Sequence, residues 1–272
     1  MPLPFLRPNR FHAGSAQINS RAGFSFSNLG GGTTAVSGAS QWTSSFMTSF
    51  DGLGNHIDLA KPNVMNNANQ VVWSWWMNAT GINNNSTIMS RLPTAGPAQM
   101  RFIFNNNNIR IFINSGSTIR QKDTTFSFVT GTNYHCLFVF DGQQPENNDK
   151  LYGFINGVSA TFGAPSGQFP NLITSGNFDW FIGQNNNAVG HFTGSIDELA
   201  VWTGITASQS DASSVYNGGH PGDLVTSSMG LPTVWLRMGD LPDSFPNLTS
   251  VGSVACTGTC TANITAFSAS VF

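Results

Sequence analysis

Short runs of apolar and aromatic residues alternate along the chain with polar clusters rich in glycine and asparagine. Runs of this length, set between turn-forming residues, are typical of strands rather than helices. Their regular spacing predicts an antiparallel β-sandwich. The runs expected to form strands are Val71–Met77, Met100–Phe104, Ile109–Ile113, Phe126–Val129, Tyr134–Phe140, Leu151–Ile155, Trp180–Ile182 and Ile196–Trp202.

Asparagine clusters separate several of these runs, at Asn83–Asn85, Asn105–Asn108 and Asn185–Asn187. Asparagine tolerates a left-handed backbone, so each cluster is expected to form a hairpin turn. The cluster Asn105–Asn108 is the clearest, because apolar and aromatic runs flank it on both sides. A single helix is expected at Thr206–Tyr216, with Thr206 as its N-terminal cap.

The length of 272 residues fits one large β-domain with appendages. Residues 1–40 are rich in proline, glycine and serine and show little periodicity, which predicts an extended N-terminal arm that gains order on binding. The sequence therefore divides into an arm at residues 1–40, a sandwich at 41–220 and a C-terminal segment at 221–272.

Charged residues make up only 9% of the chain, and the formal net charge is -2. Without a run of lysine or arginine, the chain has no field to concentrate a polyanion, so nucleic-acid binding is not expected. No apolar run approaches the roughly 20 residues that span a bilayer. The segment Met1–Pro8 lacks the basic-then-apolar order of a signal peptide, which indicates synthesis in a cytoplasm and no membrane partner.

Three cysteines leave at least one without a disulfide partner. Cys136 lies in an apolar run and is expected to be a small buried hydrophobe. Cys256 and Cys260, in Cys-Thr-Gly-Thr-Cys, would either bridge a tight turn in an oxidising environment or stay free. They make a poor zinc site, because no histidine or further cysteine lies near them.

The segment Gly194–Trp202, Gly-Ser-Ile-Asp-Glu-Leu-Ala-Val-Trp, resembles the closing strand of laminin-G-like (concanavalin A-like) jelly rolls. The resemblance covers roughly residues 45 to 220 and implies an all-β antiparallel jelly roll with one short helix. The other segments that carry it, in the order that the family uses, are Ser49–Gly52, Ile57–Leu59, Tyr134–Gly142, Leu151–Val158 and Tyr216–Gly219.

The segment Val234–Asp240, Val-Trp-Leu-Arg-Met-Gly-Asp, resembles the strand that normally opens such a domain, yet here it comes last. In one account the C-terminal segment returns to supply the missing first strand, as in a circular permutation. In the other it begins a truncated second domain. About fifty residues seldom form an independent sandwich, which favours a segment that docks back.

The same order of segments resembles proteins of tailed phages, notably marine ones, in which such domains are virion components. This resemblance implies a non-enzymatic structural protein of a capsid or tail surface, assembled with other virion proteins and copies of itself. The alternative is a carbohydrate-binding adhesion module that attaches a particle or cell to surface glycans. One protein can combine the two roles.

Catalytic residue patterns are mostly missing from the sequence. A glycosidase needs two carboxyl groups facing one cleft. The chain has two glutamates, Glu146 and Glu198, and adjacent residues such as Asp197 and Glu198 point to opposite faces of a regular strand. No Gly-x-Ser-x-Gly motif occurs, and the five histidines are scattered singly. We therefore expect no enzyme, with a glycoside hydrolase as the least favoured alternative.

Calcium is the one cofactor that the resemblance implies, bound between the closing strand and an early loop. Asp197 matches the acidic position of the closing strand, and Asp51 lies in the early loop. Hard oxygen ligands suit calcium. The alternative is that Asp197 accepts hydrogen bonds from loop amides without a metal.

Aromatic residues near loops are the candidates for glycan contact. Most of the rings lie within apolar runs, where core packing explains them. Trp42, Phe169 and Trp180 lie close to loops and are the rings predicted to touch a sugar.

Overall fold

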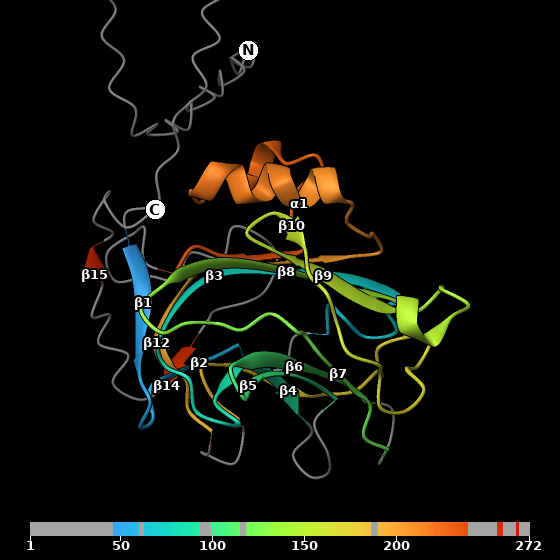
Figure 1. The fold of residues 1–272 in the computed structure, drawn as a ribbon, viewed down its shortest axis with the longest axis horizontal. Helices are drawn as coiled ribbons and strands as arrows, with labels where there is room; N and C mark the ends of the chain where they lie inside the picture. Colours follow the sequence, from blue (N-terminus) through green and yellow to red (C-terminus); the bar gives the residue numbers. More distant parts are fainter. Residues whose placement is uncertain are drawn as a thin grey trace, which may run out of the picture. The chain divides into compact units, whose positions relative to one another are not determined.

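The computed structural model describes residues 46–59, 63–92, 99–114, 118–185, 190–238, 255–257 and 265–266. These residues form two packed layers of antiparallel strands with a short helix on one layer (Figure 1). The predicted sandwich with one short helix is confirmed. The expected arm at residues 1–40 lies outside the described residues.

The first layer, here called the β3 sheet, has eight strands in the order β10-β9-β8-β3-β12-β1-β15, with β13 also paired to β12. Its strands are β1 (Phe46–Asp51), β3 (Gln70–Gly81), β8 (Asn133–Asp141), β9 (Leu151–Ile155), β10 (Val158–Ser159), β12 (Thr193–Thr203), β13 (Val234–Leu236) and β15 (Thr265–Ala266).

The second layer, here called the β5 sheet, has seven strands in the order β14-β2-β11-β4-β5-β6-β7. Its strands are β2 (His56–Asp58), β4 (Thr87–Leu92), β5 (Met100–Asn105), β6 (Asn108–Ile113), β7 (Gln121–Asp123), β11 (Asp179–Ile182) and β14 (Ala255–Thr257).

Aromatic rings fill the space between the two sheets. The ring of Phe102 meets Trp73 and Trp75 edge to face, with ring centroids 5.3 Å and 5.2 Å apart. Such pairs add to the free energy gained by burying the rings. Cys136 is buried in the same core, as predicted. Cys256 lies within β14 rather than in a turn, and Cys260 lies outside the described residues.

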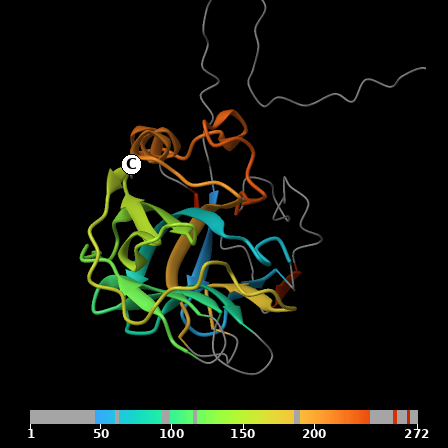
Figure 2. The ribbon, with the colours of Figure 1, turned by 90° about the vertical axis from the view of Figure 1, so that its right-hand side faces the viewer.

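Helix α1 (Gln209–Tyr216) lies over the outer face of the β3 sheet (Figure 2). A second apolar layer fills the space between the helix and this face. Val72, Leu137 and Trp202 from the sheet pack there with Ala212 and Val215 from the helix. Strands β3 and β8 are apolar at successive positions because both of their faces are buried. The turns of 3-10 helix are η1 (Asn147–Asp149), η2 (Asn217–Gly219) and η3 (Leu224–Thr226).

Helix α1 begins after Ser208, whose hydroxyl accepts the amide N–H of Asp211 at 3.2 Å. The Asp211 carboxylate accepts the Ser208 N–H at 2.9 Å, which completes a capping box. The prediction of Thr206 as the N-terminal cap was wrong, because the capping residue is Ser208, two residues later. None of the helices that the structure describes has the length and hydropathy to span a bilayer.

The hairpin predicted at Asn105–Asn108 is confirmed. Asn106 and Asn107 both adopt left-handed backbone conformations, with φ of 49° and 66°, and join β5 to β6. The strand predicted at Phe126–Val129 is wrong. Phe128 instead donates its N–H to Asn107 O at 2.8 Å and packs its ring into the core, so the apolar run reflects burial without a strand ladder.

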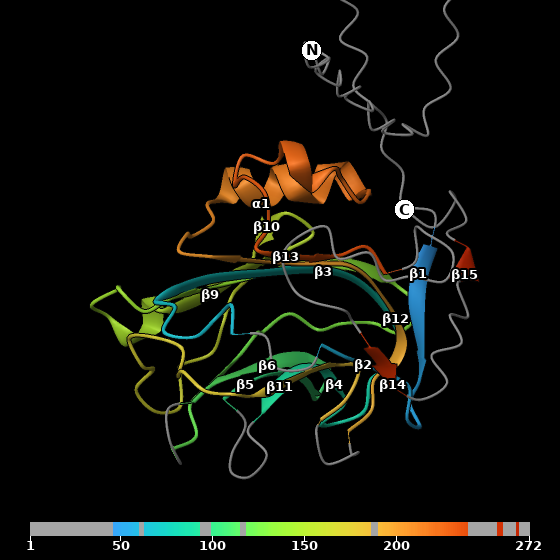
Figure 3. The same ribbon diagram turned by 180° about the vertical axis from the view of Figure 1, so that it is seen from behind.

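The C-terminal strands that the structure describes pair with the sandwich (Figure 3). Strand β13 pairs with the second half of β12, from Leu199 to Val201, while β1 pairs with the first half. Thr48 in β1 donates its hydroxyl to Met238 O at 2.8 Å, so β13 leads toward the start of β1 along one edge of β12. Strands β14 and β15 pair with β2 and β1.

Candidate functional site

The β8–β9 connection at residues 142–150 borders two neighbouring hollows in the surface. The first hollow has a volume of about 440 Å³ and is lined by Lys122, Gln144, Asn148, Asp149, Tyr152 and Phe162. The second has a volume of about 560 Å³ and is lined by residues 142–145, Asn69, Lys150, Gln168, Asn171 and Leu172. Gln144 lines both, so the two hollows adjoin at this residue.

Asp141, at the end of β8, holds this connection in place. Its carboxylate accepts the backbone N–H of Gln143 at 3.1 Å and the side-chain amide of Gln144 at 2.7 Å. Gly142 donates its N–H to Asn69 O at 2.7 Å, and a Cβ at Gly142 would lie 2.0 Å from Asn171 O. Glycine is therefore required where three distant segments meet.

Two buried lysines brace the walls. Lys122 donates to Leu151 O at 2.8 Å and to Asn148 O, and its ammonium lies 5.1 Å from the centre of the Phe162 ring. Burial lowers the pKa of Lys122, and the nearby Asp149 opposes that shift. Lys150 donates to Phe169 O at 3.4 Å and to the Asn171 side chain. Both ammonium groups thus face backbone and amide oxygens of the walls.

The surface that the hollows offer is rich in amides and has an aromatic flank. Gln143, Asn148 and Asn171 are exposed, whereas Tyr152 and Phe162 are half-buried. A side-chain amide both donates and accepts hydrogen bonds, as does a sugar hydroxyl.

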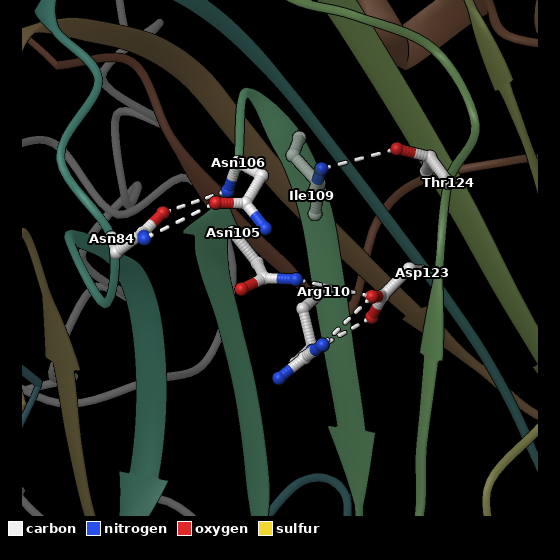
Figure 4. Close-up of polar contacts among 7 residues, drawn as sticks. All are labelled: Asn84, Asn105, Asn106, Ile109, Arg110, Asp123 and Thr124. Carbon is white, nitrogen blue, oxygen red and sulfur yellow. Dashed lines mark hydrogen bonds and ion pairs between the residues drawn. The ribbon is translucent and has the colours of Figure 1, made fainter.

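A second polar region occupies the outer face of the β5 sheet (Figure 4). The Asp123 carboxylate accepts two hydrogen bonds from the guanidinium of Arg110, at 2.8 Å and 2.9 Å, and one from the side-chain amide of Asn105 at 3.2 Å. The hydrogen bond to Asp123 raises the pKa of Arg110. At the hairpin, the Asn84 side chain accepts the Asn106 N–H at 2.7 Å. The charge of Arg110 is therefore matched within the fold.

The structure separates the two aspartates proposed for calcium. Asp51 accepts the N–H groups of Leu53, Gly54 and Asn55 at 2.9, 3.1 and 3.2 Å, and the bond to Leu53 is the largest cause of its lowered pKa. Asp51 pairs with Thr193, four residues before the buried Asp197, so the two backbones lie about 13 Å apart.

No group of three or more His, Cys, Asp or Glu side chains gathers in a metal-binding arrangement within the described ranges. Asp51 and Asp197 do not form one shared site. Calcium binding by either carboxylate alone stays a prediction.

A β-bulge places Asp197 and Glu198 on the same outer face of the β3 sheet. The register with β3 shifts between Asp197 and Ala200, and Glu198 has a φ of 47°. The expectation of opposite faces was wrong, because it assumed a regular strand. Glu198 accepts the indole N–H of Trp235 and lies 3.4 Å from Arg237 Nε. Both carboxylates are buried, and neither lines the two hollows.

The rings predicted to touch a sugar lie elsewhere in the molecule. Phe169 and Trp180 are 1% and 0% exposed and belong to the core between the sheets, so neither is available to a ligand at the surface. Trp42 lies outside the described residues. Tyr152 and Phe162 were missed, although Tyr152 lies two residues after the polar connection at residues 142–150, which was the signal that could have found it.

A family model described as the concanavalin A-like lectin/glucanases superfamily matches residues 50–210. A search of curated proteins found no match. Several solved structures are similar to this chain at low sequence identity.

One is a protein of Bacteroides ovatus proposed to bind carbohydrate, with 13% identity and a TM-score of 0.56 over 80% of this chain and 59% of that one. Another is a heptameric SAP-like pentraxin of Limulus polyphemus, with 17% identity and a TM-score of 0.48 over 80% of this chain and 98% of that one. A third is domain 4 of the arabinanase AbnA of Geobacillus stearothermophilus, with 19% identity and a TM-score of 0.47 over 62% of this chain and 76% of that one.

Proposed function

Because the chain belongs to the concanavalin A-like lectin/glucanases superfamily, we propose that it is a non-catalytic carbohydrate-binding domain. Its ligand is a neutral sugar chain that lies in the two hollows beside residues 142–150. The observation that carries the proposal is their lining of exposed amides with Tyr152 and Phe162 at one side. The fold shared with the Bacteroides ovatus protein, which is itself proposed to bind carbohydrate, supports it.

The distribution of carboxylates supports binding without hydrolysis. Hydrolysis of a glycosidic bond ordinarily uses two carboxyl groups on either side of the bond. Asp149 is the one carboxylate among the described residues that line the hollows. Asp197 and Glu198 are buried on the outer face of the β3 sheet, out of reach of a sugar chain in the hollows.

The role as a virion component stays a prediction and is compatible with glycan binding. A domain carried on a capsid or tail surface would use the same hollows to attach the particle to a host-surface glycan. Detection of the chain in symmetric copies on purified particles would test this assembly role separately from sugar binding.

A glycan array probed with labelled protein tests the binding function. Gln143 and Asn148 are exposed and line different hollows, so the double variant Gln143→Ala/Asn148→Ala removes two amides with little effect on folding. The matched control is Asn83→Ala, an exposed asparagine just after the other end of β3.

We expect the wild type and the control to bind at least one class of neutral oligosaccharide. The double variant should bind the same class about tenfold more weakly, as the loss of two neutral hydrogen bonds predicts. Equal binding by all three proteins, or no binding by the wild type, would contradict the proposal.

A further inference from the structure

Arg101 stands in a row of side chains that crosses the outer face of the β5 sheet. Its neighbour on β6 is Phe112, and Gln121 of β7 lies beyond it. On the other side Arg101 is paired with Ser90 of β4, and Phe181 of β11 follows. Residues paired across strands share a face, so these side chains form one continuous strip.

The guanidinium of Arg101 carries a charge that the described fold does not match. Its central carbon lies 4.4 Å from the centre of the Phe112 ring, and its buried Nε has no hydrogen-bond partner among the described residues. Burial and the neighbouring Arg110 lower the pKa of Arg101. No carboxylate of the described segments forms an ion pair with it. A partly buried cation without an anion costs free energy.

Two other arginines show how this fold satisfies such groups elsewhere. Arg110, on the same face, is bound through two nitrogens by Asp123. Arg91 is fully buried and, like Arg101, has a buried Nε without a partner among the described residues, yet its two terminal nitrogens donate to Thr174 O at 3.1 Å and to the Asn66 side chain. Arg101 makes neither kind of contact with the part of the chain that the structure describes.

The other described carboxylates on this face do not neutralise the charge of Arg101. Asp123 is already engaged by Arg110 and Asn105. Asp179 lies on β11 and Asp58 on β2, two and three strands from β5, so their backbones are about 10 Å or more away. The centre of the strip is therefore positive, although the chain as a whole carries a formal net charge of -2.

We propose that Arg101 is the anion-binding residue of a second site, which takes the carboxylate or sulfate group of an acidic glycan on the outer face of the β5 sheet. A guanidinium offers planar paired donors that fit either group, and burial strengthens the contact. One unmatched charge suits a single acidic group on a mostly neutral chain, whereas a nucleic acid needs many. Arg101 lines neither hollow, so the site is distinct from the one for neutral sugar.

Calorimetric titration of the full chain tests this site with three probes. They are trigalacturonate, a heparin-derived tetrasaccharide and neutral galactotriose, which separate a carboxylate from a sulfate and both from no charge. The variants are Arg101→Gln and Arg101→Lys. The control Arg120→Gln removes the same charge from the loop before β7. If only the overall charge of the protein mattered, the two variants Arg101→Gln and Arg120→Gln would lose the same affinity for the acidic probes.

We expect the wild type to bind an acidic probe at least about tenfold more tightly than galactotriose, and Arg120→Gln to keep that preference. Arg101→Gln should lose the preference, and Arg101→Lys should keep part of it because lysine retains charge without paired donors. The acidic probe should also raise the melting temperature of the wild type but not that of Arg101→Gln.

Equal affinity of the wild type for all three probes, or an equal loss in Arg101→Gln and Arg120→Gln, would overturn the proposal. Failure of the hollows to bind neutral sugar would contradict the proposed function but would not overturn this second site. Galactotriose and the variants at residues 143 and 148 report on the hollows separately.

Discussion

The outer faces of the two sheets differ in what lies on them. On the β3 sheet, Val72 and Trp202 are buried against helix α1. On the β5 sheet, Arg101, Arg110 and Asp123 stand at the corresponding outward positions. The difference is visible along single strands, because β3 is buried at successive positions whereas Arg101 and Asn105 of β5 are half-buried polar residues next to buried apolar ones. The face under the helix thus serves stability, whereas the other face keeps half-buried polar side chains that can meet a ligand.

The largest expected effect comes from the covered face. Trp235→Ala should lower the free energy of unfolding by about 3–5 kcal/mol, because the ring is 1% exposed and its indole N–H binds Glu198. Urea denaturation measures this change. The control Val158→Ala, at a side chain that is 65% exposed, should change it by less than about 0.5 kcal/mol. Similar losses of unfolding free energy in the two variants would contradict the distinction between the covered face and the exposed surface.

His135 makes the covered face sensitive to pH. Its Nε2 lies 2.8 Å from Ser74 Oγ, and burial lowers its pKa to about 3. The unfolded chain binds a proton near pH 6.5, so this contribution to stability is complete above that pH and falls as the pH drops toward 3. By pH 5 the loss is about 2 kcal/mol.

Denaturation at pH 7 and pH 5 checks this effect in His135→Gln against the control His220→Gln, at an exposed histidine. The His135 variant should lose less stability between the two pH values than the wild type, and the control should behave like the wild type. An unchanged difference in the His135 variant would show that this group does not titrate as described.

The stability of helix α1, which covers the outer face of the β3 sheet, depends on its N-terminal cap. Ser208→Ala removes the hydroxyl that accepts the Asp211 N–H and should cost about 1 kcal/mol. Ser214→Ala, at an exposed position within the same helix, should be neutral or slightly stabilising. Thermal melts of the two variants compare them directly, and equal melting temperatures would contradict the capping role.

The smallest effect is expected on the β5 sheet. Arg110 and Asp123 are 27% and 29% exposed, so Arg110→Gln should cost less than about 1 kcal/mol. A double-mutant cycle with Asp123→Asn isolates the energy of the pair. A coupling above about 3 kcal/mol would mean that this face is as fully desolvated as the covered one.

Local sequence chemistry was enough to predict several elements. The β5–β6 hairpin followed from asparagines that tolerate left-handed turns, and β9 was predicted at its observed bounds, Leu151–Ile155. The bulge at Glu198 could not be predicted, because one inserted residue leaves no mark on an apolar pattern. The run Phe126–Val129 misled for a related reason, since buried rings suggest a strand even where no ladder partner exists.

The hollows could not be predicted from the sequence because they are assembled from distant segments. Asn69, Gly142 and Asn171 meet only through the packing of three loops. The rings chosen for glycan contact, Phe169 and Trp180, were near loops in sequence but face the core. Nearness to a loop does not fix the side to which a ring points.

The most direct test of the central claim is a two-dimensional NMR titration of the wild-type chain with neutral oligosaccharides selected on the array. The account predicts that the side-chain amide signals of Gln143, Gln144 and Asn148 shift in a saturable way, whereas that of Asn83 does not. Saturable shifts confined to other parts of the molecule, or none at all, would contradict it.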